Sequence, residues 1–342
     1  NLNASYFNVG RTTSYAVMTI PYAPNSFTTG NPVLVNIDDT WTDVIDLTFN
    51  FCFFGTMYNK IVVGSNGIIS FDTTYANDFC NYDLTMSGGI PDNGLPTNSI
   101  MGVYQDIDPT FMGSIYYEIM GVSPCRKFVV TYYDVPYYGD PNSIDPSYCI
   151  DPIFATTQIV LYETTNAIDI FSKDKPNCTD WNDGLAIQGI QNATGALAYS
   201  VPGRNNTVFS LTNDGYRFLP NGLSIVSFSW LLNGSIIGTN TSIQVCPVTS
   251  TTYTAQAVYT ACDGTQIIET DNVVVNPVGV VQGTVSVSQQ PNCNFPASGA
   301  LLASGAGGTG PYSYAWSNGA TTAAVSGLPA GTYTVTITDA GG

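Results

Sequence analysis

The chain has 342 residues, of which 44% are apolar, so it is long enough for two or three domains with cores of their own. Eight Lys and Arg residues stand against 25 Asp and Glu residues, and this net charge of −17 argues against nucleic acid and anionic membranes as partners. The absence of histidine excludes Ser-His-Asp catalysis and histidine-ligated zinc, and no apolar run is long enough to span a bilayer.

The first part of the chain carries clear strand patterns. Residues 43–55 place Phe49, Phe51 and Phe53 at alternate positions, which is the spacing of a strand with one buried face. Residues 60–72 hold two short apolar segments on either side of a Ser-Asn-Gly sequence, and this arrangement predicts a β-hairpin.

Three further segments, at 127–138, 156–165 and 166–173, predict a meander of antiparallel strands. Pro136 should lie at a strand end or on an edge strand, because proline cannot donate to the ladder. No segment has the pattern of an amphipathic helix of three turns. We therefore expect an all-β fold, with an N-terminal β-sandwich followed by two small immunoglobulin-like β-sandwich modules.

A change of composition near residues 217–222 marks a domain boundary, because no lysine or arginine occurs after Arg217. Residues 227–275 contain Trp230, an Asn-Gly turn and a Thr-rich strand, which predict a small immunoglobulin-like sandwich. We expect the stretch 276–283 to be a second linker. The expected domains are 1–219, 220–277 and 278–342.

The cysteines favour disulfides over thiolate metal sites, because no Cys-x-x-Cys pair is present. The first domain holds five of the eight, so at least one of these five must be free or must pair elsewhere. If the meander forms, Cys149 and Cys178 lie at the same edge of the sheet. We prefer this bridge to a second one between Cys52 and Cys80.

In the second module, Cys246 and Cys262 flank the Thr-rich strand. We expect them to form a disulfide that closes a hairpin-sized loop and contributes about 3 kcal/mol to stability.

Acidic residues supply the strongest candidates for a site. Asp106 and Asp108 are spaced so that, on a strand, both carboxylates point to one face and can share a calcium ion. The alternatives are a glycosidase-like acid pair and, as the default, a solvated strand end. A second calcium candidate is the Pro-rich loop with Asp140, Asp145 and Asp151, although its spacing is not that of an EF-hand and a rigid solvated loop is the default there.

Tyrosines occur in adjacent pairs at 116–117, 132–133 and 137–138. Neighbours on a strand face opposite sides, so one ring of each pair is expected to be exposed, where it can stack on a sugar or seal a subunit contact. Packing against the sheet is the simpler interpretation of these pairs.

The last 33 residues, GPYSYAWSNGATTAAVSGLPAGTYTVTITDAGG (310–342), resemble the repeat of the SprB gliding adhesin and related giant surface proteins of the Bacteroidetes. The resemblance covers 282–342 and rests on Pro-Tyr, Trp-Ser-x-Gly, a Thr-Thr strand, a Leu-x-x-Gly turn and a final Tyr-Thr-Val strand. Tyr312, Tyr314 and Trp316 alternate onto one face, opposite the strand 333–337. Such repeats continue with a cysteine, so this module is expected to be truncated at its C-terminal end.

The N-terminal region also resembles known domains. VVGSNGIISFD (62–72) and NSIMGVYQDIDPTFMGSIYYEI (98–119) are similar to the N-terminal domain of large Bacteroidetes proteins exported by the type 9 secretion system and, more loosely, to the NIDO domain of extracellular matrix and adhesion proteins. This resemblance implies export through the outer membrane to the cell surface or beyond. Asp72-Thr73-Thr74 would then fit the O-glycosylation motif of that phylum, with Thr73 modified.

Together these patterns predict a non-catalytic extracellular surface adhesin or fibre protein, with an N-terminal head on a stalk of β-sandwich repeats. We expect a surface polysaccharide or another extracellular ligand as partner, further repeats of the same chain, and no cofactor other than calcium. One alternative is a self-assembling filament or sheath subunit, a homo-oligomer in which residues 1–17 pair with a neighbouring sheet edge. The other is a carbohydrate-binding module or glycosidase that uses Asp106 and Asp108.

Overall fold

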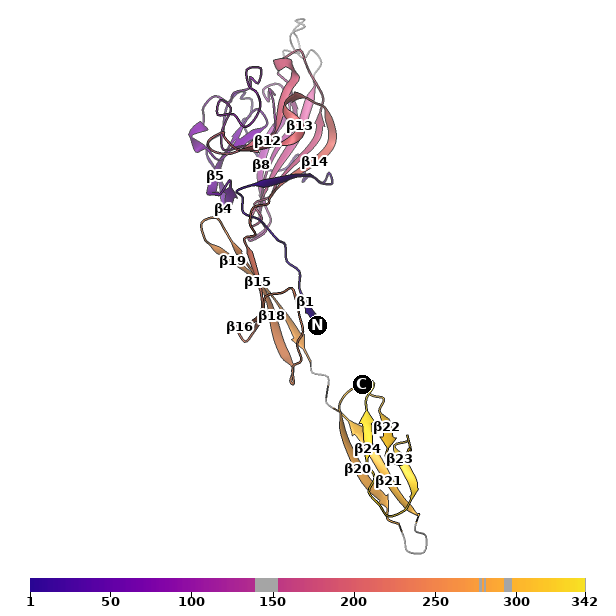
Figure 1. The fold of residues 1–342 in the computed structure, drawn as a ribbon. Coiled ribbons are helices and arrows are strands. Elements are labelled where there is room, and N and C mark those ends of the chain that lie inside the picture. Colours follow the sequence, from indigo (N-terminus) through magenta and orange to yellow (C-terminus); the bar gives the residue numbers. More distant parts are fainter. Residues whose placement is uncertain (139–152, 277–278, 280, 292–296, 342) are drawn as a thin grey trace. The chain divides into compact units, whose positions relative to one another are not determined.

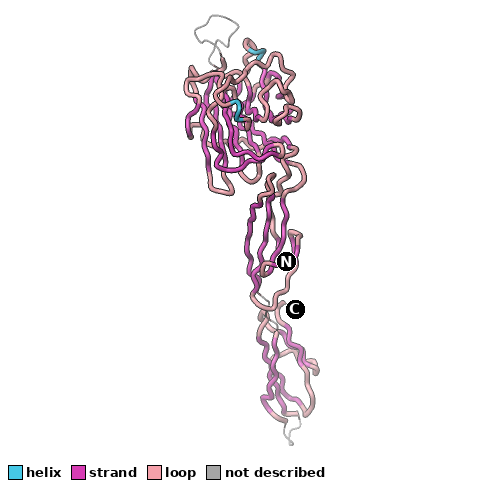
Figure 2. The backbone as a smooth tube through the Cα atoms, turned by 90° about the vertical axis from the view of Figure 1, so that its left-hand side faces the viewer, coloured by secondary structure: helices cyan, strands magenta, loops and turns pink. Residues whose placement is uncertain are grey.

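The computed structural model of the protein describes residues 1–138, 153–276, 279, 281–291 and 297–341. Within these residues the regular structure is strand, apart from the two short 3₁₀ helices Thr73–Tyr75 and Asn182–Gly184, which are cyan in Figure 2. The predicted all-β fold class is confirmed. None of the helices in the described part of the chain has the length and apolar character needed to cross a bilayer.

A seven-stranded antiparallel sheet forms one layer of the N-terminal region, in the order β2-β14-β11-β10-β9-β8-β3. Its strands β8 and β14 are labelled in Figure 1. Strands β9, β10 and β11 are consecutive neighbours in it, which confirms the predicted meander, and β9 ends at Pro136 as expected. The strands are β2 (Tyr15–Thr19), β3 (Asn31–Val33), β8 (Ser114–Met120), β9 (Lys127–Pro136), β10 (Phe154–Tyr162), β11 (Ile168–Lys175) and β14 (Leu211–Pro220).

A six-stranded antiparallel sheet forms the second layer, in the order β13-β12-β7-β6-β5-β4. The predicted hairpin of residues 60–72 is present as β5 and β6, and Gly67 closes its turn with a φ of +77° that favours glycine. The strands are β4 (Ile45–Phe53), β5 (Thr56–Gly64), β6 (Ile68–Ser70), β7 (Ser99–Tyr104), β12 (Leu185–Gln191) and β13 (Ala198–Val208).

The main hydrophobic core lies between these two sheets and is rich in aromatic rings. Phe49, Phe51 and Phe53 point into it from alternate positions of β4, as the sequence pattern predicted. Phe51 stacks on Phe71 with 5.5 Å between the ring centroids. Each fully buried phenylalanine contributes about 1.5–3 kcal/mol, so this row of rings holds the two sheets together.

A four-stranded sheet follows in the order β16-β15-β18-β19, and the short strands β1 and β17 pair with each other. β15 and β16 are joined by Asn233 and Gly234, both with positive φ, which is the predicted Asn-Gly turn. The strands are β1 (Leu2–Asn3), β15 (Val226–Leu232), β16 (Ser235–Gly238), β17 (Ser242–Ile243), β18 (Thr251–Thr260) and β19 (Gln266–Val275).

The C-terminal strands form a three-stranded sheet, β20-β21-β23, and a two-stranded sheet, β22-β24. Trp316 pairs with Val335 and Tyr314 with Ile337, which confirms the predicted facing strands. Ala303, Trp316, Val325 and Leu328 form a small core there. The strands are β20 (Gln282–Gln289), β21 (Gly299–Ala306), β22 (Ser313–Trp316), β23 (Ala324–Leu328) and β24 (Val335–Thr338).

The chain divides into two compact units. One comprises Ser5–Phe228 and Gln256–Thr270 and contains both large sheets. The other comprises Asn1–Ala4, Ser229–Ala255 and Asp271–Gly342. The three domains expected from the sequence, with the bounds 1–219, 220–277 and 278–342, stay a prediction.

Candidate functional site

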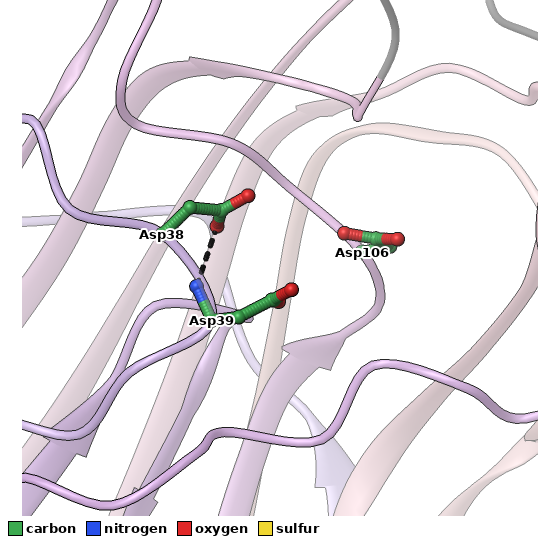
Figure 3. Close-up of side chains that lie close together, drawn as sticks. All are labelled: Asp38, Asp39 and Asp106. Carbon is green, nitrogen blue, oxygen red and sulfur yellow. Dashed lines mark hydrogen bonds between the residues drawn. The ribbon is translucent and has the colours of Figure 1, made fainter.

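Three carboxylates from two distant segments come together in the N-terminal region (Figure 3). Asp38 and Asp39 lie in the connection between β3 and β4, and Asp106 lies in the segment that follows β7. One oxygen from each carboxylate lies within 4.8 Å of the others. Figure 3 shows Asp106 with one oxygen turned toward Asp38 and Asp39. We call these three residues the acidic cluster.

The side chain of Asn66 ties together the segments that carry the acidic cluster. Its amide donates to Asp39 Oδ1 at 3.0 Å and to the Cys80 carbonyl at 3.1 Å, and its Oδ1 accepts from the Ile107 amide at 3.1 Å. Asp39 adopts a positive φ of 49°, which Asp and Asn tolerate better than most residues. The turn of the β5–β6 hairpin thus fixes both arms of the cluster.

Burial and mutual repulsion change the acidity of the cluster. The pKa of Asp106 is raised to about 8, first by burial and then by the charges of Asp39, Asp38 and Asp108, against the hydrogen bond from Trp181, which lowers it. Burial, followed by the charge of Asp108, raises the pKa of Asp38 to about 7. The pKa of Asp39 is also raised, first by burial. Each charged form is therefore disfavoured, mainly because burial removes it from water.

The predicted pair of Asp106 and Asp108 lies in a buried environment, not at the protein surface. Both are buried, with exposed fractions of 5% and 4%, so the default interpretation of a solvated strand end is wrong. They flank Ile107, which makes an isolated bridge to Tyr137 beyond the end of β7. Asp108 Oδ1 accepts from the Thr110 amide at 2.7 Å, while Asp106 joins the acidic cluster.

The remaining predicted site residues are Thr73 and three aspartates of the Pro-rich loop. Asp140, Asp145 and Asp151 lie outside the described residues, so a calcium site there stays a prediction. Thr73 begins a 3₁₀ turn capped by Asp72, and its glycosylation also stays a prediction. Asp38 and Asp39 were not identified from the sequence, where the adjacent Asp-Asp pair before Trp41 is the one visible signal.

A family comparison covers the region that holds this cluster. The family model described as NIDO related matches residues 14–228, which is more than half of the chain. The chain belongs to the NIDO-related family. Searches of curated proteins and of solved structures found no match to it.

Membership of the NIDO-related family confirms the NIDO-like N-terminal domain that the sequence motifs predicted. The matched residues include both large sheets and the whole acidic cluster.

Four aromatic side chains of the NIDO-related domain lie in a row that reaches the acidic cluster. The ring centroids are 6.1 Å apart for Phe79 and Tyr82, 6.4 Å for Tyr82 and Trp181, and 5.1 Å for Trp181 and Tyr138. Phe79 is 58% exposed and the other three rings are half-buried. Trp181 Nε1 donates to Asp106 Oδ2 at 2.5 Å, so this ring is fixed. We call these four residues the aromatic strip.

The disulfides differ from those expected. Cys52 is bonded to Cys262, and both belong to the compact unit that contains the NIDO-related domain. The predicted Cys246–Cys262 bridge is wrong, because these residues precede and follow the extended strand β18, whose length is about 30 Å and far exceeds the span of a disulfide. Cys246 is free and exposed.

The predicted Cys52–Cys80 bridge is also wrong. Cys52 pairs with Met57 at the start of β5, whereas the Cys80 sulfur lies against Gly64 at its end. These positions are about 23 Å apart along an extended strand. Cys80 is free and packs in a second buried cluster with Trp41.

The predicted Cys149–Cys178 bridge stays a prediction. Cys178 is disulfide-bonded, but Cys149 lies outside the described residues. Disulfides persist in oxidising compartments, so the Cys52–Cys262 bond and the family together fit an extracellular protein.

Proposed function

We propose that this chain is a non-catalytic extracellular adhesion protein whose NIDO-related domain binds a surface polysaccharide through the aromatic strip. The observation that carries the proposal is the row of four neighbouring rings, one of them largely exposed and another held by a buried carboxylate. The apolar C–H face of a sugar ring can pack on such a ring, and its hydroxyls reach polar groups beside it. A fixed ring loses little conformational entropy when a ligand binds.

Binding is favoured over hydrolysis by the surroundings of the carboxylates. A glycosidase places two carboxyl groups on either side of an accessible scissile bond. Here Asp106 and Asp108 are both buried, and Asp106 uses one oxygen to hold Trp181. Two of the larger described cavities, with volumes of about 880 and 590 Å³, are lined by other residues.

The resemblance of residues 282–342 to a gliding-adhesin repeat supports a stalk role for the C-terminal strands, in a surface protein exported across the outer membrane. A filament is less well supported, because the N-terminal segment that it would donate is already engaged within its own chain. β1 pairs with β17, and β2 pairs with β14 at the edge of the seven-stranded sheet.

Affinity electrophoresis of the full chain through gels that contain neutral or acidic soluble polysaccharides tests the proposal. We expect retardation by at least one polysaccharide, and an affinity about tenfold lower for Phe79→Ala and for Tyr82→Ala, since each removes one stacking surface. The matched control is Phe111→Ala, an exposed ring that is not part of the strip. It should be retarded like the wild type.

Equal retardation of Phe79→Ala, Tyr82→Ala and Phe111→Ala would show that the aromatic strip is not the binding surface. The same polysaccharides should yield no soluble oligosaccharide after prolonged incubation with the wild-type chain. Release that is lost in Asp106→Asn would support a glycosidase instead.

A further inference from the structure

The acidic cluster presents oxygen atoms at the spacing of a calcium site. Calcium is bound by oxygens at about 2.3–2.6 Å, so ligand atoms on opposite sides of the ion are about 5 Å apart. One carboxylate oxygen each from Asp38, Asp39 and Asp106 lies within 4.8 Å of the other two. A single ion can therefore touch all three carboxylates without a rearrangement of the backbone.

A second observation, separate from the oxygen spacing, is that Asp106 Oδ1 has no hydrogen-bond donor among the described residues. Asp106 is 5% exposed, and its Oδ2 accepts from Trp181, but its Oδ1 is buried and accepts no hydrogen bond from the described residues. A buried carboxylate oxygen without a partner is costly and rare in folded proteins. The carboxylate lies beside Asp38 and Asp39 in Figure 3.

Among the described residues, no ion pair offsets the carboxylates of the acidic cluster. The ion pairs formed by described residues are Arg126–Glu163, Lys173–Asp134, Arg204–Asp214 and Arg217–Asp169, and none includes a residue of the cluster. Asp108 adds a fourth nearby negative charge. A divalent cation would supply the charge that the described side chains do not.

We propose that Asp38, Asp39 and Asp106 bind a calcium ion. The ligand set contains only oxygen, which disfavours zinc, and it comes from irregular connections that can add carbonyl groups and water to reach a coordination number of six to eight. Magnesium requires a smaller, near-octahedral arrangement. The ion joins the β3–β4 connection to the segment after β7, and through Asp106 it supports Trp181 of the aromatic strip.

Calcium titration of the full chain, stripped of metal with EDTA and followed by calorimetry, tests this site. We expect binding of one ion at the cluster with a dissociation constant of about 10⁻⁴–10⁻³ M, as in other extracellular modules, and a higher thermal midpoint with CaCl₂ than with MgCl₂. Asp39→Asn and Asp106→Asn should weaken this binding at least tenfold. Asp83→Asn, an exposed carboxylate in a local turn, is the matched control and should bind like the wild type.

Terbium luminescence localises the ion and covers the case in which Asp106→Asn fails to fold. Trp181 is hydrogen-bonded to Asp106, so a bound Tb³⁺ should emit when tryptophan is excited. Trp181→Phe should lose much of the emission but weaken calcium binding less than Asp38→Asn, which should lose both.

The proposal is overturned if the folded wild-type chain binds no calcium at millimolar concentration. It is also overturned if binding survives in Asp38→Asn and Asp39→Asn but disappears when Asp140, Asp145 and Asp151 are changed together to Asn. These measurements use no polysaccharide, so their failure and a failure of polysaccharide binding are separate results.

Discussion

Lys175 is a buried lysine whose pKa is lowered by its surroundings. It is the last residue of β11 and is 1% exposed, with Nζ donating to the Phe209 carbonyl at 2.8 Å and lying 4.6 Å from the centre of the Phe209 ring. No carboxylate among the described residues forms an ion pair with it. Burial, and then the charge of Arg204, lowers the pKa of Lys175 from 10.5 to about 8.

This lowered pKa predicts a stability difference that depends on pH. Between pH 8 and pH 10.5 the unfolded chain keeps the Lys175 proton and the folded chain releases it, so folding becomes more favourable as pH rises. Relative to Lys175→Met, the wild type should gain roughly 2–3 kcal/mol of unfolding free energy between pH 7 and pH 10. Urea titrations of both proteins at the two pH values measure it. A difference that stays constant with pH would contradict the burial of a charged Lys175.

Of the three residues of the acidic cluster, the sequence pattern indicated Asp106 but neither Asp38 nor Asp39. Asp106 was a candidate because carboxylates two positions apart share a face on a strand, but the structure places it beyond the end of β7. Asp38 and Asp39 belong to another connection, and they reach Asp106 because Asn66 bonds to both segments. No local pattern contains that contact. Local spacing could therefore indicate one ligand, and only the topology of the sheet could supply the other two.

At the scale of the elements, features that depend on neighbouring residues were predictable. The alternating phenylalanines of β4, the β5–β6 hairpin and the Asn-Gly turn at Asn233 each follow from local side-chain period or backbone preference. Cysteine pairing depends instead on where distant strands end. Each incorrect bridge would have to span the length of one extended strand, β18 for Cys246–Cys262 and β5 for Cys52–Cys80. The bond that forms, Cys52–Cys262, joins residues 210 positions apart.

The Cys52–Cys262 bond closes a long loop. It should therefore stabilise the folded state by lowering the conformational entropy of the unfolded chain. We expect the double variant Cys52→Ala/Cys262→Ala to lose about 3–5 kcal/mol of unfolding free energy in urea titrations followed by circular dichroism. The control is Cys246→Ser, which removes an exposed free thiol and should leave the midpoint unchanged. A double variant as stable as the wild type would mean that strand packing alone determines stability.

At the scale of the whole molecule, the C-terminal strands carry a core that is small but their own. β20, β21 and β23 pair only among themselves, as do β22 and β24, within the described part of the chain. Their buried cluster, with Trp316 and Leu328, draws its partners from residues 301–337. This arrangement is what the predicted module 278–342 requires if it is to serve as one repeat of a stalk.

A fragment of residues 278–342 should therefore fold by itself. Trp316 is its single tryptophan and is buried, so a cooperative change in its fluorescence during a urea titration would report the unfolding of this core directly. Because so short a chain buries little apolar surface, we expect a stability of only about 3–5 kcal/mol. Trp316→Phe, followed by circular dichroism, should remain folded but less stable, since the indole Nε1 bond to the Thr322 carbonyl is lost. The prediction would be contradicted if the fragment 278–342 stayed unfolded but a longer fragment, 220–342, folded. That result would show that the second and third predicted domains fold as one cooperative unit.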